Sequence, residues 1–455
     1  MYSYLFVAPY DGAGGYGGLS NAVLIPNHPP VAELAADPVE GPPGLTVNFD
    51  AAGSYDIDGP IVKYEWDWEG DGTYDYEATG AATHHTYGVA DYYFPRLRVH
   101  DAQGATDSAE VTIWVGRWHI YDPVTENIWH CTPNNICMRV VNGHPAISVW
   151  TGVGDGCGWG FAYVRAADAL GESWGAPVIV DNEVDNISNL CGDNSLAVVD
   201  GHPALAYCNE HEEDYWYCRA EDPNGDAWGT TVRLGPGRVT EYDMLSLAVV
   251  NGHPAVRYFG GWFIRAQDPQ GQSWGEPVRV PCGGMLLEVN GRPALLSAYS
   301  YVRANDPDGE SWGEPVTLNP DPGYSSFIQA SAAIVNGRPA VAYAWKPEGA
   351  SEYEVRFVRA LDVNGAAWGA PVMVAESGGQ PSLAVVKGKP AVCYLHGYGL
   401  WYAGARDADG TRWKPPMLVE DDGAGNYDCL QEVNGCPAVS YFGETSHFLR
   451  YAIYY

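Results

Sequence analysis

Four carboxylates lie close together in a glycine-containing stretch early in the chain. Asp67, Glu69 and Asp71 alternate along this stretch, and Asp75 comes shortly after. Calcium prefers carboxylate oxygens of this kind, although the terminal bidentate Glu of an EF-hand loop is missing here. Alternatively, Asp67 accepts hydrogen bonds from backbone N–H groups of a turn. The sequence therefore predicts either a calcium site or an acid-capped loop.

Four charged residues depart from the columns of uncharged residues in a repeated strand pattern. Arg139, Glu288 and Glu432 fall in the first strand of their repeats, and Arg257 falls in a second strand. Polar groups on the inner strands of a ring of sheets often line its channel, so all four are candidate ligand-binding residues. Arg139 and Glu432 could instead form a structural ion pair. Glu288 and Glu432 are also candidate paired carboxylates of a glycosidase or lyase.

Aromatic residues accompany carboxylates in the longest loops between the expected strands, which include residues 152–160, 209–214 and 346–354. Aromatic platforms beside hydrogen-bonding acids suit carbohydrate recognition, although the same rings could simply pack the loops. The candidate binding residues in or beside these loops are Trp159, Trp216, Trp345 and Trp401.

The ten cysteines favour disulfides over zinc, because no CxxC pair occurs. One candidate pair flanks an expected hairpin, a second would staple the first repeat to the last if the geometry allows it, and a third lies in loops of one face. Disulfides would imply an oxidising compartment. In that order, the candidate pairs are Cys208 with Cys218, Cys137 with Cys429, and Cys157 with Cys191.

One unit positions most of these residues and recurs about seven times, most clearly at residues 246–280. It reads as four short strands, with an Asn-Gly turn between the first two that tolerates the positive φ of a tight hairpin. Self-similarity of this kind predicts a seven-bladed β-propeller over residues 116–455 of an all-β chain. The turn glycines are Gly143, Gly201, Gly252, Gly291, Gly337, Gly388 and Gly435.

Five repeats share a spaced pattern in their third and fourth strands, as in Arg165, Asp168, Gly171 and Trp174, and a sixth has Gly404 in the Arg place. We expect Asp to cap the turn, Trp to pack between blades and Arg to pair with a carboxylate or carbonyl, because a role copied in every blade supports the blade. The pattern resembles the Asp-box of sialidase-type propellers, but Asp and Gly are one residue too far apart. The repeats also resemble propeller-forming repeats of large bacterial secreted proteins.

The last repeat contains three of the four expected strands, and the missing strand is predicted at residues 116–124, where Trp118 matches Trp174. We expect this segment to pair with the strand at 448–455. Such strand exchange would close the ring and remove its exposed edges.

Residues 29–115 form a separate unit of alternating strands, as in an antiparallel sandwich. The string YEWDWEGDG, the later HTY and the final V-x-D-x-x-G resemble the polycystin-type PKD domain, an immunoglobulin-like module of surface and secreted proteins. This resemblance implies a spacer, adhesion or mechanical role and rarely catalysis.

Residues 1–28 are expected to be an extended segment or linker, in which two β-prone runs flank a Gly-rich hinge. A piece this short cannot bury a core of its own. It is either the tail of a preceding domain, a strand packed on the sandwich next to it in sequence, or a strand that adds to another subunit in a polymer.

Charge narrows the choice of partners. A formal net charge of −33 repels phosphate, so nucleic acid is a poor partner, whereas cations, neutral glycans and basic proteins are compatible. No apolar run is long enough to span a bilayer, and residues 1–23 lack the basic and apolar regions of a signal peptide.

We therefore expect a non-catalytic extracellular or cell-surface binding or adhesion protein. It would hold a glycan or protein on the propeller loops, use the PKD domain as a spacer and require no cofactor, with calcium as the optional ion. One alternative is a structural subunit of an extracellular filament or sheath that self-associates through residues 1–28. The other is a propeller glycosidase or lyase, although no Ser/His/Asp order, phosphate loop or metal triad stands out.

Overall fold

The computed structural model describes residues 27–124, 136–153, 158–184, 194–209, 214–236, 245–318, 330–421, 429–443 and 449–455, together with β1 (Ser3–Leu5) and β2 (Val23–Ile25). The regular elements of these residues are all β-strands, as the sequence predicts. In this part of the chain, no helix is long and apolar enough to cross a membrane. The chain divides into two compact units: Met1–Arg117 with Tyr454–Tyr455, and Trp118–Ile453.

The first unit contains short sheets around one apolar core, with strand orders β11-β10-β6-β7, β3-β5-β8 and β4-β12-β9. Residues alternate along β5 and β10, so that Val47, Phe49, Leu97 and Val99 point inward and pack around Trp66. The strands of this sandwich are β3 (Ala35–Asp37), β4 (Glu40–Gly41), β5 (Leu45–Asp50), β6 (Ile61–Asp67), β7 (Tyr76–Ala78), β8 (Ala82–Tyr87), β9 (Asp91–Tyr93), β10 (Arg96–Asp101), β11 (Thr106–Glu110) and β12 (Ile113–Val115).

The N-terminal runs of this unit pair with each other. β1 and β2 are antiparallel, with Ser3 opposite Ile25 and Leu5 opposite Val23. The sequence predicts β-prone runs at these places, but it does not predict that they form a hairpin together.

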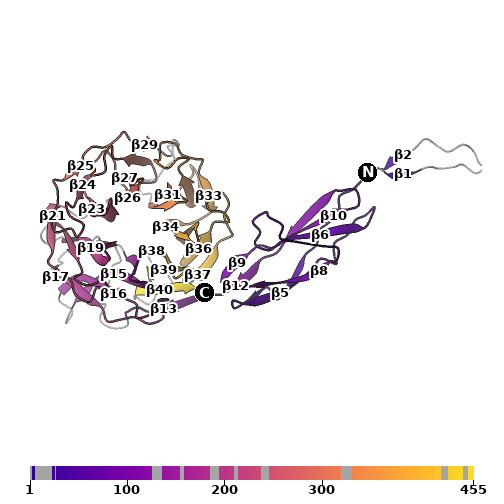
Figure 1. Ribbon diagram of the computed structural model, residues 1–455, viewed down its shortest axis with the longest axis horizontal. Coiled ribbons are helices and arrows are strands. Elements are labelled where there is room, and N and C mark those ends of the chain that lie inside the picture. The colour runs from indigo at the N-terminus through magenta and orange to yellow at the C-terminus, as the bar shows by residue number, and fades with distance from the viewer. Residues whose placement is uncertain are drawn as a thin grey trace, which may run out of the picture. The chain divides into compact units, whose positions relative to one another are not determined.

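The second unit is a ring of four-stranded antiparallel sheets, and its described residues form seven such blades (Figure 1). Blades 1 to 3 are β14 (Cys137–Val141), β15 (His144–Val153), β16 (Gly158–Arg165) and β17 (Val178–Val184); β18 (Asn194–Val199), β19 (His202–Asn209), β20 (Asp214–Arg219) and β21 (Val232–Pro236); and β22 (Ser246–Val250), β23 (His253–Tyr258), β24 (Trp262–Arg265) and β25 (Val278–Arg279).

The later blades repeat this order. Blades 4 to 6 are β26 (Met285–Val289), β27 (Arg292–Leu296), β28 (Ser300–Arg303) and β29 (Val316–Thr317); β30 (Ala330–Val335), β31 (Arg338–Trp345), β32 (Glu354–Arg359) and β33 (Val372–Ala375); and β34 (Gly379–Val386), β35 (Lys389–His396), β36 (Gly399–Gly404) and β37 (Met417–Glu420). Blade 7 is β38 (Cys429–Val433), β39 (Cys436–Phe442), β40 (Leu449–Tyr454) and, from the other end of the unit, β13 (Trp118–Tyr121).

Blade 7 therefore combines strands from both ends of the propeller sequence, in the order β13-β40-β39-β38. The fourth strand predicted at residues 116–124 lies beside the C-terminal strand, as expected. The innermost strand of blade 1, β14, contacts β38 of blade 7 as well as β18 of blade 2. The first and last blades are thus neighbours.

The hairpin between the first two strands of each blade has two successive residues with positive φ. In blade 1 they are Asn142, at 46°, and Gly143, at 79°. The same pair recurs in the other blades, with Asp200 and Lys387 in the Asn place of blades 2 and 6. Two positive φ values define the type I′ turn that Asn-Gly favours, so the turn signal is confirmed.

The spaced Asp and Arg of the repeat have the structural roles that the sequence predicts. Asp168 accepts hydrogen bonds from four backbone N–H groups of its turn and from Ser173 Oγ at 2.5 Å. Arg165 donates to the carbonyl oxygens of Val141 and Asn142, both at 3.0 Å. The Asp therefore organises the turn, and the Arg ties the third strand to the first hairpin.

The motif Trp packs against an aromatic ring on the third strand of the preceding blade. Trp228 meets Tyr163 of blade 1 edge-on, with ring centroids 5.3 Å apart, and Trp174 meets Tyr451 of blade 7 at 5.2 Å. Trp118 of β13 meets Tyr402 of blade 6 at 5.5 Å, in the same arrangement. The equivalent pairs in the other blades are Trp274 with Tyr217, Trp312 with Phe263, Trp368 with Tyr301 and Trp413 with Phe357.

The turn glycine is required by the same contact. Gly171 has a φ of 77°, and a Cβ on it would lie 2.6 Å from the Tyr451 ring. Any larger residue would push the preceding blade away, so glycine and aromatic ring are matched at this joint.

A second set of contacts joins the innermost strands. The side chain six residues before the turn glycine accepts a hydrogen bond from a backbone N–H of the next blade, as Ser195 Oγ does from Leu247 at 3.0 Å. Cys429 Sγ takes this place between blades 7 and 1, 3.3 Å from the Met138 nitrogen. The other pairs are Ser246 with Leu286, Met285 with Ala332, Ser331 with Leu383 and Ser382 with Leu430.

Candidate functional site

Loops from neighbouring blades meet on one face of the propeller. Because consecutive strands alternate in direction, the loops between second and third strands emerge on the same side as the connections from each blade to the next. We call this side the loop face. Between blades 5 and 6 it is tied together by the Gly378 N–H, which donates to the Tyr353 carbonyl oxygen at 2.8 Å.

A cluster of polar and aromatic side chains lies at this joint. His396 Nδ1 is 3.9 Å from Glu352 Oε2, and His396 Nε2 is 3.5 Å from Ser377 Oγ. Tyr353 is 37% exposed and Tyr398 is 76% exposed. We call Glu352, Tyr353, Ser377, His396 and Tyr398 the blade 5/6 cluster.

This cluster combines flat apolar rings with hydrogen-bonding groups that solvent reaches. Glu352 and His396 are both largely exposed, so their polar atoms are open to a ligand as well as to each other. Lys346 Nζ lies 5.4 Å from the centre of the Tyr353 ring and adds a cation beside it. The arrangement can therefore stack an apolar ligand face and hydrogen-bond its polar edge.

The tryptophans predicted for this face are mostly packed between blades. Trp345 is buried, with the Arg356 guanidinium 3.7 Å from its ring centre. Trp216 is partly buried against the core between blades 1 and 2. Trp401 packs partly against the core between blades 5 and 6, and its ring lies 6.5 Å from His396 at the edge of the cluster. The side chain of Trp159 lies outside the described residues.

The four charged candidates do not converge on one site. The Arg139 guanidinium donates to the Met138 carbonyl oxygen at 2.7 Å and lies 3.8 Å from Cys429 Sγ. Arg257 is buried within blade 3. Glu288 accepts a hydrogen bond from the Asn251 N–H at 2.7 Å, and Glu432 accepts one from the Lys387 N–H.

These contacts have two consequences. The sequence offers an ion pair between Arg139 and Glu432 as an alternative, but the contacts of Arg139 described above are with Met138 and Cys429. Glu288 and Glu432 each tie their own blade, 4 and 7 respectively, to the turn of the preceding blade. They therefore serve two separate joints rather than forming one pair of acids.

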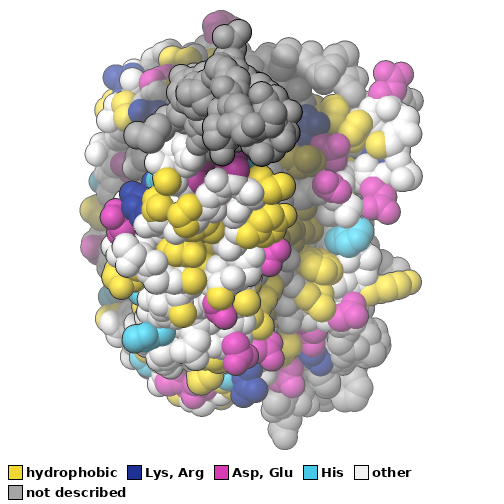
Figure 2. All heavy atoms as spheres, turned by 90° about the vertical axis from the view of Figure 1, so that its right-hand side faces the viewer, with side chains coloured by type: hydrophobic (Ala, Val, Ile, Leu, Met, Phe, Trp, Pro, Cys, Tyr) yellow, Lys and Arg dark blue, Asp and Glu magenta, His cyan; other side chains and the backbone are white. Residues whose placement is uncertain are grey.

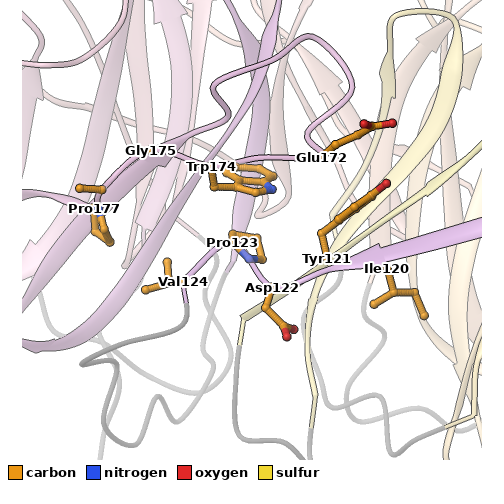
Figure 3. Close-up of a pocket in the computed structure, with 10 residues that line it drawn as sticks. Ile120, Tyr121, Asp122, Pro123, Val124, Glu172, Trp174, Gly175 and Pro177 are labelled. Atoms are coloured by element: carbon orange, nitrogen blue, oxygen red, sulfur yellow. The ribbon is translucent and has the colours of Figure 1, made fainter.

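A pocket of about 630 Å³ lies between β13 and the turn that starts the fourth strand of blade 1 (Figure 3). Its Trp174 is held by the fold, because the indole N–H donates to the Gly171 carbonyl oxygen at 2.8 Å. Asp122, at its rim, lies 3.8 Å from Arg450. The sequence does not point to this pocket. Its lining is Ile120, Tyr121, Asp122, Pro123, Val124, Glu172, Trp174, Gly175, Ala176 and Pro177.

In the first unit, the oxygens of Asp67, Glu69 and Asp75 lie within 4.8 Å of one another. Asp67 accepts hydrogen bonds from three backbone N–H groups of its loop, at 2.8, 3.2 and 2.8 Å. Asp71 accepts one from the Thr73 N–H at 2.7 Å. Burial raises the pKa of Asp67 and of Glu69, and the Asp75 charge adds to the rise at Glu69. Asp67 caps the loop as expected, and calcium binding by these four residues stays a prediction.

The disulfide predictions have different outcomes. Cys208 and Cys218 are free thiols, and the proposed bond between them is wrong. The hairpin places Tyr215 opposite Cys208 and Leu205 opposite Cys218, so the two sulfurs point to opposite faces of the sheet. Cys137 and Cys429 are also free thiols, but they are hydrogen-bonded to each other. Cys157 and Cys191 lie outside the described residues.

Sequence reasoning does not single out Glu352, Ser377 or His396. The loop over residues 346–354 is expected on the binding face, and its acidic and aromatic composition is the signal that could have selected Glu352. His396 stands where blade 6 has only a tight turn, between two strands that otherwise match the repeat. No residue spacing along the chain links it to Glu352.

Residues 27–115 match the family model of the PKD domain, which confirms the resemblance found in the sequence. The PKD1 domain of Vibrio anguillarum Epp is similar to this chain at 31% identity over 20% of this chain and 96% of its own, with a TM-score of 0.16. YCF48 bound to D1 peptide is similar at 13% identity over 74% and 94%, with a TM-score of 0.46. The NanB sialidase of Streptococcus pneumoniae is similar at 10% identity over 90% and 88%, with a TM-score of 0.40.

Proposed function

We propose that this protein is a non-catalytic extracellular or cell-surface binding protein that holds a neutral carbohydrate at the blade 5/6 cluster. The PKD domain acts as a spacer. One observation carries the proposal: the exposed rings of Tyr353 and Tyr398 accompany a contact between His396 and Glu352 from adjacent blades.

A sugar suits these groups for simple physical reasons. Its C–H face is apolar enough to lie against a tyrosine ring, and its hydroxyls both donate and accept hydrogen bonds. Glu352 offers acceptors, Ser377 offers a hydroxyl, and His396 offers one donor and one acceptor when neutral. An uncharged ligand also avoids the cost of placing an anion beside Glu352.

The charge of the whole surface supports a neutral ligand. Figure 2 shows Asp and Glu side chains spread over the visible face, with fewer Lys and Arg. The formal net charge is −33, so polyanionic ligands are repelled over a long range at low salt. A PKD domain is typical of surface and secreted proteins, where neutral glycans are abundant.

The two alternatives have less support. The enzyme reading needs a pair of acids a few ångströms apart, whereas Glu288 and Glu432 bond to backbone N–H groups at different joints. The filament reading depends on residues 1–28, of which only β1 and β2 and the last two residues are described, and it stays a prediction.

A glycan array followed by calorimetry tests the proposal. We expect the wild type to retain a neutral glycan, and Tyr353→Ala and Tyr398→Ala to weaken its binding at least tenfold, or about 1.4 kcal/mol. Tyr55→Ala removes an exposed tyrosine of the first unit and is the matched control. Retention of proteins but no glycan, or equal losses in the control, would refute the carbohydrate assignment.

A further inference from the structure

The joint between blades 7 and 1 differs chemically from the other joints of the inner strands. Cys429 makes the contact to the next blade here, whereas other joints use Met285 or one of four serines, which are Ser195, Ser246, Ser331 and Ser382. The residue at the same position of blade 1 is Cys137, whose Sγ lies 3.7 Å from the Leu196 carbonyl oxygen of blade 2. Cysteines thus occupy this position of the repeat in two adjacent blades, 7 and 1.

The two thiols are in contact. A hydrogen bond joins Cys137 and Cys429, and Cys429 Sγ also lies 3.6 Å from the Met138 carbonyl oxygen. Both residues keep part of their surface exposed to solvent. The pair links strands β14 and β38, which lie side by side but 292 residues apart in sequence, as 429 minus 137 gives.

A fixed positive charge accompanies them. Arg139 Nη1 donates to the Met138 carbonyl oxygen at 2.7 Å and lies 3.8 Å from Cys429 Sγ. The hydrogen bond from Cys429 lowers the pKa of Cys137 despite its burial, and the Arg139 charge lowers it further. The pKa of Cys429 is raised, because it holds the shared proton. These shifts favour loss of a proton from Cys137 before Cys429, and the thiolate formed in this way is the nucleophilic form of a cysteine.

We propose that Cys137 and Cys429 form a reactive dithiol, which low-molecular-weight disulfides convert to a covalent link between blades 1 and 7. The Cys137 thiolate attacks one sulfur of the small disulfide, forms a mixed disulfide and releases one thiolate. Cys429 then loses its proton and attacks Cys137 Sγ, which releases the second thiolate. The two protein thiols lose two electrons, and the small disulfide is reduced to two thiols.

The disulfide would strengthen the place where the two ends of the propeller sequence meet without a covalent bond. β13 and β40 come from opposite ends of the propeller sequence and pair within blade 7, so loss of this pairing would let β38, β39 and β40 separate from blade 1 and open the ring. A disulfide from β38 to β14 prevents that separation. It also closes a very long loop, for which the entropy of the unfolded chain falls most.

Incubation of the reduced full-length protein with oxidised glutathione tests the proposal. We expect non-reducing peptide mapping to recover a peptide pair that joins Cys137 to Cys429. We also expect a higher unfolding temperature that dithiothreitol reverses. Cys137→Ser/Cys429→Ser should fold, because serine makes this contact in four other blades, and it should lose the shift. Cys282→Ser/Cys436→Ser removes two other free thiols and should keep the shift.

Two results would overturn the proposal. One is a stable glutathione adduct on either cysteine without the linked peptide pair. The other is a temperature shift that persists in Cys137→Ser/Cys429→Ser. Arg139→Met tests the effect of the positive charge without changing the two cysteines. The linked peptide pair should still form, but the pH at which the rate of disulfide formation is half-maximal should move upward.

Discussion

The turn aspartates of the propeller show how one side chain organises a loop. Burial opposes ionisation of Asp168, but hydrogen bonds from Ser173 and from backbone N–H groups outweigh it and lower its pKa to about 2. The pKa values of the equivalent aspartates Asp222, Asp268, Asp306, Asp362 and Asp407 are lowered as well. Ionised carboxylates at these turns therefore stabilise the folded propeller.

Replacing Asp168 with Asn should destabilise the propeller by about 1–3 kcal/mol at neutral pH, because one amide N–H would face a backbone donor. The folded-state pKa lies below the ordinary 3.8, so the stabilisation is present above about pH 4 and is lost as the pH falls towards 2. Thermal unfolding should show a gap between wild type and Asp168→Asn that narrows over this range. Asp226→Asn, exposed in the next such turn, should show little gap. A gap that does not change with pH would contradict the role of the charge.

At the scale of single elements, β13 is a short strand that holds two neighbouring blades. It supplies the fourth strand of blade 7 and places Trp118 against Tyr402 of blade 6. The same contact joins Trp228 to Tyr163 between two blades that are consecutive in sequence. A comparison of the Trp118 contact with the Trp228 contact therefore measures the contribution of strand exchange to stability.

Trp118→Ala and Trp228→Ala should each lower the free energy of unfolding by roughly 2–4 kcal/mol, because each removes a partly buried indole from a joint. Urea unfolding followed by circular dichroism measures both. Stability that falls in Trp228→Ala but not in Trp118→Ala would mean that β13 does not hold the ring. Tyr398→Ala, on an exposed loop, should leave stability nearly unchanged.

Most strands and turns were predictable because their signals are local. Asn142-Gly143 can adopt two positive φ values, and Asp168 bonds only to later residues within the same turn. The inner-strand contacts were not predictable, since Ser195 and Leu247 meet only when neighbouring blades pack side by side. The error at Cys208 and Cys218 has a related cause, because hairpin register decides which face each sulfur takes.

At the scale of the whole molecule, the formal net charge of −33 is the dominant electrostatic feature. Like charges on a folded surface repel each other, and salt screens this repulsion over roughly 10 Å at 0.1 M. We expect the unfolding temperature to rise as sodium chloride increases from low ionic strength. Choline chloride should give a similar rise if screening is the cause. A rise with sodium chloride alone would indicate specific cation binding, and a fall with both would contradict the argument.

The order of the two units and the number of blades could be predicted, because the PKD-like motifs and the seven repeats are continuous segments of the sequence. The binding cluster could not. Glu352 and Ser377 come from connections that the repeat does not constrain, and His396 ends β35. They meet only because blades 5 and 6 are adjacent. The sequence also predicts Trp216 and Trp345 as binding residues, but large rings near loops can fill the spaces between blades instead, as these two do.

Hydrogen–deuterium exchange with and without the glycan selected on the array tests the central claim most directly. Ligand binding at the blade 5/6 cluster should slow exchange in residues 346–354 and 396–401 and leave residues 120–124 and 172–177 unchanged. Protection at the β13 pocket instead, or no protection anywhere on the loop face at saturating glycan, would contradict the proposed site.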